Sequence, residues 1–258
     1  MLNKKETKLK ELYSLVSKHS KYQSLPKRLS SVINTNDIEV KSRYESERLK
    51  YIFENVDINN KTVLDIGGNT GFFTFEMIDN GARKLHYYEG NSAHAEFVKI
   101  SAEILKVEDK IKVTNDFFTF ENCEHKSKYD IALLLNVLHH IGDDYGDNKI
   151  SMEMAKETII KQINMLSLMV DTLILQLGFN WKGNRDLCLF EKGTKKEMID
   201  FIGSGTKNYW RIIKIGIAES RDGRIGYYDL NEKNVIKVPS LGEFLNRPIF
   251  IMKSIVSI

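Results

Sequence analysis

A glycine-rich turn between two apolar segments limits the folds open to this sequence, and it reads VLDIGGNTGFFT over residues 63–74. The apolar run before the turn predicts a buried strand, and the apolar-periodic run after it predicts a helix. Glycines let the backbone of the turn pass close to a bound ligand, and the helix points its first amide groups and the positive end of its dipole at the same place. The turn therefore predicts an α/β fold that binds a ligand at this helix N-terminus.

An acidic residue stands about twenty positions further along, at the end of the next strand-like run. Glu89 closes this run, which is His86-Tyr87-Tyr88-Glu89. Doubly wound folds place a carboxylate here, where it accepts hydrogen bonds from ribose hydroxyls. The turn and Glu89 together predict a nucleoside-containing cofactor.

The spacing of the glycines distinguishes between nucleoside cofactors. A dinucleotide-binding turn has the form G-x-G-x-x-G, whereas this sequence has Asp65, Gly67, Asn69 and Gly71 at alternate positions. This spacing resembles motif I of the class I S-adenosylmethionine (SAM)-dependent methyltransferases, D/E-x-G-x-G-x-G. Asn69 departs from the motif where the middle glycine normally stands, and because Asn tolerates positive φ we expect a positive or otherwise unusual φ there. The alternative is an ordinary strand-turn-helix whose glycines bind nothing.

The resemblance covers roughly Glu45 to the C-terminus and implies a SAM site at the carboxyl ends of the strands. Asp116 matches the acidic residue that typically holds the adenine amino group in this family, with Phe117 beside it as an apolar wall; a helix N-cap is the alternative role for Asp116. Asp65 is expected to touch the ligand, to brace the turn through backbone amides, or both. The expected cofactor-binding residues are Asp65, Gly67, Gly68, Asn69, Gly71, Phe72, Glu89, Gly90, Asn115, Asp116, Phe117 and Asn136.

Strand-like and helix-like runs alternate along the chain, which predicts an α/β fold with a three-layer doubly wound sheet of about seven strands, plus N-terminal helices. The expected strands are 62–66, 85–89, 111–115, 130–135, 172–177, 209–217 and 249–255, and the expected helices include 4–19, 45–55 and 149–168. Turn signals within residues 221–228 indicate a small hairpin. The resemblance implies that the last strand is antiparallel. We expect residues 1–45 to form an N-terminal helical extension or lid and residues 46–258 to form the methyltransferase domain.

The composition is that of a soluble globular protein. A chain of 258 residues can bury a substantial core, and its 42% hydrophobic and 28% charged residues are ordinary values. Cys123 and Cys188 are too few for a disulfide framework or a zinc site, so a cytoplasmic location is expected. No apolar run approaches the length of a membrane span, and the first residues have no signal-type apolar core. The net charge of +3 does not by itself indicate a nucleic-acid partner.

Methyl transfer from an activated sulfonium mainly requires alignment and exclusion of water, but an oxygen or nitrogen nucleophile must also lose a proton. The run NVLHH at residues 136–140 resembles the segment that follows the fourth strand in small-molecule members of the family. His139 and His140 are the expected catalytic bases because histidine titrates near neutral pH; structural packing is the alternative for each. His139 is slightly preferred, since one helical turn would bring it to the same face as Asn136.

The polar loop 142–148 adds aspartates that, with His139 and His140, suggest a metal site. The same loop also has the residues expected of a cap for the following helix, and no metal is predicted.

The acceptor pocket is expected in the loops after the fourth and fifth strands. The expected substrate-binding residues are Tyr145, Gln176, Asn180, Trp181, Arg185 and Arg247. Aromatic, amide and guanidinium groups suit a polar small molecule such as a saccharide, and an arginine suits its phosphate or carboxylate, although a solvated surface charge is the alternative for each arginine. We therefore expect O-methylation of a saccharide or phosphorylated saccharide.

Two other functions stay open. An RNA methyltransferase would use the lysine-rich N-terminal helix together with Lys192, Lys195 and Lys196 as phosphate contacts. However, no clustered basic and aromatic surface is evident, and the base-methylating motif Asn-Pro-Pro-Tyr does not follow the fourth strand. A non-catalytic module that binds the cofactor or a partner protein is disfavoured by the intact glycine turn with both Glu89 and Asp116.

Overall fold

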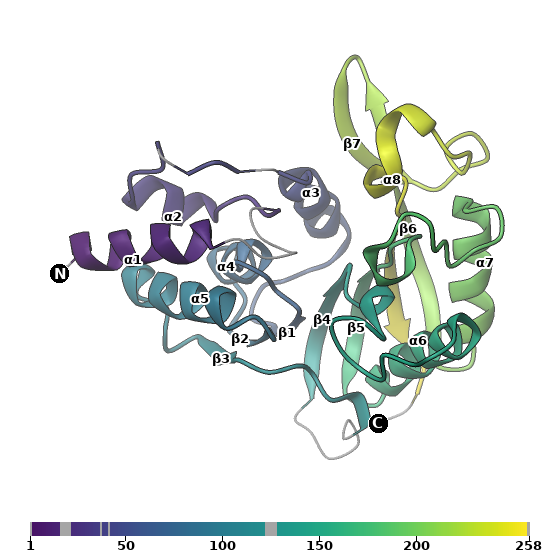
Figure 1. The fold of residues 1–258 in the computed structure, drawn as a ribbon, viewed down its shortest axis with the longest axis horizontal. Coiled ribbons are helices and arrows are strands. Elements are labelled where there is room, and N and C mark those ends of the chain that lie inside the picture. Colours follow the sequence, from purple (N-terminus) through teal and green to yellow (C-terminus); the bar gives the residue numbers. More distant parts are fainter. Residues whose placement is uncertain (1, 16–21, 37, 41, 122–127, 257–258) are drawn as a thin grey trace. The chain divides into compact units, whose positions relative to one another are not determined.

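The computed structural model describes residues 2–15, 22–36, 38–40, 42–121 and 128–256 (Figure 1). Cys123 and the last residues of the expected helix 4–19 lie outside these ranges. The chain forms two compact units, residues 1–118 and residues 119–258. Among the described residues, no helix combines the length and the apolar character that crossing a membrane requires.

Among its described residues, the first unit combines five helices with three parallel strands. Its elements are α1 (Leu2–Ser14), α2 (Lys27–Val32), α3 (Glu45–Asn55), β1 (Thr62–Ile66), α4 (Phe72–Asp79), β2 (Lys84–Tyr88), α5 (Ser92–Leu105) and β3 (Ile111–Thr114). The strands lie in the order β3-β2-β1. The register pairs Ile66 with Tyr88 and Tyr88 with Thr114, so the carboxyl ends of all three strands lie side by side.

Burial explains why these residues form these elements. Val63 and Leu64 in β1 are fully buried, and a parallel strand covered on both faces has such a continuous apolar run. Helix α4 is buried over nearly its whole length, and its Glu76 accepts a hydrogen bond from the backbone N–H of Lys27 at 2.9 Å. Helices α1 and α2 pack against α5. The N-terminal helices are therefore part of the compact first unit.

The second unit contains a mixed sheet with strand order β4-β5-β8-β6-β7. Its elements are β4 (Tyr129–Leu135), η2 (Leu138–His140), α6 (Met152–Leu166), β5 (Val170–Gln176), η3 (Trp181–Gly183), α7 (Lys195–Thr206), β6 (Trp210–Arg221), β7 (Arg224–Asp229), η4 (Pro239–Leu241), α8 (Gly242–Leu245) and β8 (Ile249–Ser254). Strands β4 and β5 are parallel, whereas β8 runs antiparallel to both of its neighbours. Strands β6 and β7 form an antiparallel hairpin.

The structure confirms the α/β class, the seven expected strands and the antiparallel last strand, and the hairpin signals at residues 221–228 correspond to β7, an eighth strand. Helix α2, which was not among the expected helices, begins after Pro26, because the fixed φ of proline suits the start of a helix. The helix expected from residue 149 begins only at Met152, since the Ser151 side chain caps it by accepting a hydrogen bond from Met154 N. The domain boundary after residue 45 stays a prediction.

Candidate functional site

The glycine turn joins β1 to α4 through three residues with positive φ: Gly67 (70°), Asn69 (53°) and Gly71 (81°). The expected positive φ at Asn69 is thereby confirmed. The Asn69 side chain supports this conformation, because its Oδ1 accepts a hydrogen bond from Thr70 N at 2.8 Å. Its backbone carbonyl accepts a hydrogen bond from the hydroxyl of Tyr87. Asn69 thus adopts, at the position of the motif glycine, a left-handed conformation that glycine also adopts readily.

Gly68 is required by close packing. A Cβ atom added at Gly68 would lie 2.5 Å from Cε2 of Tyr87 and 2.8 Å from Oδ2 of Asp65. The Tyr87 side chain is fully buried and has no room to move aside. Any side chain at this position would therefore displace either the tyrosine ring or the turn.

Asp65 is buried and braces the start of α4. Its Oδ2 accepts a hydrogen bond from the hydroxyl of Thr74 at 2.6 Å. Burial raises the pKa of Asp65 to about 7; the Thr74 hydrogen bond opposes this rise, and the charge of Glu89 adds to it. The bracing group is a side-chain hydroxyl, which corrects the expectation that Asp65 acts through backbone amides.

Glu89 links the glycine turn to the start of α5. Its Oε2 accepts a hydrogen bond from Asn69 N at 2.9 Å, and its Oε1 accepts one from Asn91 N at 2.9 Å. A carboxylate oxygen has more than one lone pair, so both oxygens can also accept from ribose hydroxyls. The two backbone contacts hold the carboxylate in place for such a ligand.

The residues expected on the adenine side lie together at the ends of β2 and β3. Asn115 Nδ2 donates to the carbonyl of Glu89 at 2.9 Å. The half-exposed ring of Phe117 covers Gly90, where an added Cβ would lie 2.5 Å from its Cζ. Asp116 is exposed and accepts a hydrogen bond from Phe117 N at 2.8 Å, and residues 117–119 are not helical, so the helix N-cap alternative for Asp116 is wrong. An exposed ring above bare backbone suits a planar base.

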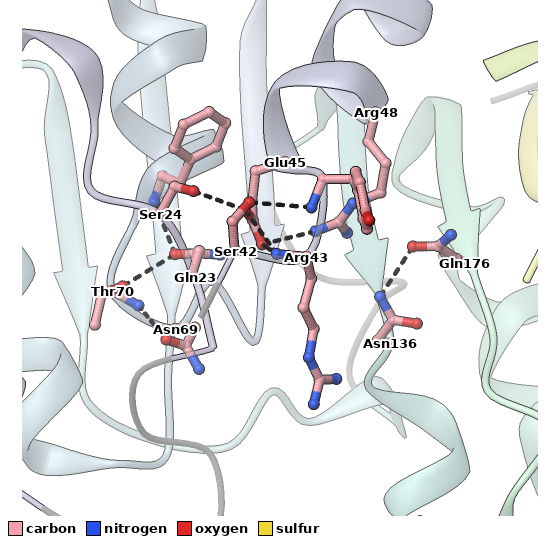
Figure 2. Close-up of polar contacts among 12 residues, drawn as sticks. Gln23, Ser24, Ser42, Arg43, Glu45, Arg48, Asn69, Thr70, Asn136 and Gln176 are labelled. Atoms are coloured by element: carbon pink, nitrogen blue, oxygen red, sulfur yellow. Dashed lines mark hydrogen bonds and ion pairs between the residues drawn. The ribbon is translucent and has the colours of Figure 1, made fainter. Parts of the chain in front are cut away.

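The sequence reasoning missed Gln23, which lies at the N-terminus of α4. Figure 2 shows its carboxamide between the loop that precedes α2 and the glycine turn. Its Oε1 accepts hydrogen bonds from Phe72 N at 2.9 Å and from Thr70 Oγ1 at 3.2 Å. Gln23 belongs to no motif and is far from the turn in the sequence, so no local pattern could have indicated these contacts.

In the second unit, Asn136, Gln176 and Arg247 form one polar network. Asn136 Nδ2 donates to Gln176 Oε1 at 2.9 Å (Figure 2), and Arg247 donates to Asn136 Oδ1 at 2.8 Å. Gln176 Nε2 in turn donates to the carbonyl of Arg247 at 3.1 Å. Glu243 pairs with the guanidinium of Arg247. The structure therefore brings three of the predicted site residues together, with the charge of Arg247 already compensated by a carboxylate.

The remaining predicted substrate residues differ in exposure. Tyr145 is largely enclosed, its hydroxyl donates to Gln162 Oε1 at 3.2 Å, and burial raises its pKa well above the ordinary value for tyrosine. Trp181 is buried and donates to the carbonyl of Ile141 at 2.8 Å. Asn180 is half-buried and Arg185 is exposed. These residues form no single open surface, and their role in binding an acceptor stays a prediction.

The two candidate histidines have different surroundings. His139 is buried, its Nδ1 accepts a hydrogen bond from Gly178 N at 3.2 Å, and a Cβ at Gly178 would lie 2.6 Å from its ring. The helical turn expected to align Asn136 with His139 does not form, because Asn136 has a φ of 63° and the η2 turn begins after it. His140 is half-buried, and its Nδ1 lies 3.1 Å from Oδ2 of Asp144.

The loop after η2 also carries the residues that suggested a metal site. One ligand atom from each of His140, Asp143 and Asp144 lies within 4.8 Å of the others. Asp143 is exposed, and all three residues belong to one short turn. Exposed carboxylates often cluster without a metal, and the absence of a metal here stays a prediction.

No protein-family model matches the sequence, and no curated protein matches it. Solved structures match it in fold. WbdD in complex with the kinase inhibitor LY294002 has a TM-score of 0.59 and 16% identity over 95% of this chain and 47% of that chain. A structure described as the bifunctional kinase-methyltransferase WbdD has a TM-score of 0.54 and 16% identity over 95% of this chain and 46% of that chain. The chain thus spans less than half the length of these WbdD structures. Magnesium protoporphyrin IX methyltransferase from Synechocystis PCC 6803 with bound SAM has a TM-score of 0.48 and 13% identity, over 81% of this chain and 76% of that chain.

Proposed function

We propose that this chain, which has the fold of the class I methyltransferases, binds SAM and transfers its methyl group to a polar small molecule. The observation that carries the proposal is the hydrogen bond from Asn69 N to the Glu89 carboxylate, made by a glycine turn that keeps its positive φ values. This contact supports the proposal because a carboxylate beside the turn at the N-terminus of α4 can accept hydrogen bonds from ribose hydroxyls. Dinucleotide binding is disfavoured because the turn lacks the G-x-G-x-x-G spacing.

The first unit supplies the groups that would hold the cofactor. The Glu89 carboxylate would accept from the ribose hydroxyls, and the exposed face of Phe117 would stack on the adenine ring. Asp116, which is exposed beside Phe117, would accept from the adenine amino group. When bound, SAM supplies a methyl group on a sulfonium that is already activated for displacement.

His140 is the proposed general base, in preference to His139. A carboxylate close to Nδ1 favours the tautomer that carries its proton there, which leaves Nε2 to take the proton of an acceptor hydroxyl. Oδ2 of Asp144 lies 3.1 Å from the Nδ1 of His140, whereas the Nδ1 of His139 accepts from the backbone of Gly178. His139 is then a packing residue. A saccharide or phosphorylated saccharide is the proposed acceptor, on the amide and aromatic groups that follow β4 and β5.

The proposal is tested by a methyl-transfer screen with labelled SAM against saccharides, saccharide phosphates and total RNA. We expect label in a saccharide class, and a loss of about a hundredfold or more in kcat for His140→Gln, as for removal of a general base. The matched variant His139→Gln should lose activity only in proportion to any loss of stability, measured by its Tm. Label in RNA alone would contradict the acceptor class. Undiminished kcat in His140→Gln would contradict the assignment of the base.

A further inference from the structure

We propose that Gln23 and Arg43 recognise the amino-acid end of the cofactor, which carries an α-carboxylate. Both residues belong to the N-terminal segment, defined here as residues 22–36, 38–40 and 42–48. The inference rests on the proposed SAM binding and adds to it a part of the chain that carries no cofactor motif.

The orientation of the Gln23 carboxamide is fixed by its partners. Phe72 N and the Thr70 hydroxyl both donate, so the oxygen of the carboxamide must face them. Both lone pairs of that oxygen are then used. Among the residues that the structure describes, no group accepts from Nε2 of Gln23. Two N–H donors are therefore held at the glycine turn.

Ser24, the residue after Gln23, is held through its side chain by Glu45, a buried carboxylate that is only 1% exposed. Figure 2 shows Glu45 at the centre of a cluster in which Ser24 Oγ and Ser42 Oγ both donate to its Oε2 at 2.8 Å. Arg43 N donates to its Oε1 at 2.9 Å, and Arg48 pairs with the same oxygen at 3.3 Å. Because each of these donors satisfies a buried charge, the cluster fixes the two ends of the N-terminal segment against each other.

Arg43 places a positive charge over Tyr22, the residue before Gln23. Its guanidinium lies over the ring of Tyr22, 4.1 Å from the ring centroid, and Tyr22 directly precedes Gln23. The backbone of Arg43 is held by the Glu45 cluster. A guanidinium together with amide donors is a common combination for binding a carboxylate.

The order of contacts around the turn places this pair at the correct end of the cofactor. Phe117 covers Gly90, the residue after Glu89, and Glu89 accepts from the backbone of Asn69. Gln23 accepts from Thr70 and from Phe72, which follow Asn69 toward α4. A ligand whose adenine stacks on Phe117 and whose ribose meets Glu89 would extend its amino-acid chain toward Gln23.

Two ligands and a charge-matched control test the inference. S-adenosylhomocysteine has the amino-acid end, whereas 5′-methylthioadenosine shares its adenine and ribose but lacks that end. Gln23→Glu keeps an oxygen for Phe72 N and Thr70, and a carboxylate is tolerated at a helix N-terminus, but it replaces the amide donors with a negative charge. Lys27→Gln changes the net charge equally, at an exposed position of the same segment.

We expect Gln23→Glu to raise the Kd for S-adenosylhomocysteine about tenfold or more and to leave the Kd for 5′-methylthioadenosine unchanged. Arg43→Gln should act in the same direction, and Lys27→Gln should change neither value. An equal loss for both ligands would mean that Gln23 only shapes the turn, and an unchanged Kd for S-adenosylhomocysteine would also overturn the inference. If the unmodified protein binds neither ligand, the proposed function itself fails.

Discussion

The Asp65 carboxyl group is buried, and burial disfavours its charged form. Its pKa of about 7 lies above the ordinary value of 3.8, mainly because burial disfavours the ionised form. The folded chain therefore keeps a proton that the unfolded chain releases between these two values. The contribution of protonated Asp65 to the free energy of unfolding is complete below about pH 4 and is lost as the pH rises through about 7.

Replacing Asp65 with asparagine should remove this pH dependence. Asp65→Asn retains an oxygen for the Thr74 hydroxyl and cannot ionise. At about pH 8.5 we expect the Tm of this variant to exceed that of the unmodified protein, by roughly 2–4 °C for each kcal/mol that burying the Asp65 charge costs. At about pH 5 we expect no such gain. Thermal melts of the ligand-free protein at both pH values measure this. A Tm difference of the same size and sign at both would show that the charge of Asp65 is not the cause.

Two loops shape the site: the turn between β1 and α4, which contains Gly68, and the loop after β2, which contains Gly90. The two packing glycines should respond differently to substitution. Gly68→Ala pushes against the buried ring of Tyr87 and the Asp65 carboxylate, so we expect a loss of about 1–3 kcal/mol of stability, as for other overpacked sites. Gly90→Ala pushes only against the half-exposed ring of Phe117, which can turn into solvent. Its free energy of unfolding should stay close to that of the unmodified protein. Chemical denaturation compares the two, and equal destabilisation would contradict this account of the packing.

Much of the fold could be predicted because its signals are local. The turn, Glu89 and the apolar runs of the strands each depend on neighbouring residues, and the structure has them where the sequence indicates. The contacts of Gln23 depend instead on the tertiary position of a segment without a motif. For the same reason the sequence did not show that Gln176, Trp181 and Arg247 are buried. The expected alignment of His139 with Asn136 was wrong because it assumed a helical turn that the left-handed conformation of Asn136 prevents.

For the molecule as a whole, the two units carry different parts of the proposed function. Every residue proposed to bind the cofactor except Asn136 belongs to the first unit, and the proposed base and acceptor residues belong to the second. The N-terminal helices pack within the first unit and bring Gln23 to the turn. Recognition of the cofactor is therefore expected to depend on the N-terminal segment as well as on the motif.

The central claim, that the glycine turn and Glu89 bind SAM, is tested most directly by calorimetric titration of the full chain with S-adenosylhomocysteine. We predict one site per chain for this ligand and no detectable binding of NAD. Glu89→Ala should weaken binding by about ten- to a hundredfold, because the ribose hydroxyls would lose a charged acceptor. Absence of binding by S-adenosylhomocysteine, or the same affinity in Glu89→Ala, would contradict the account.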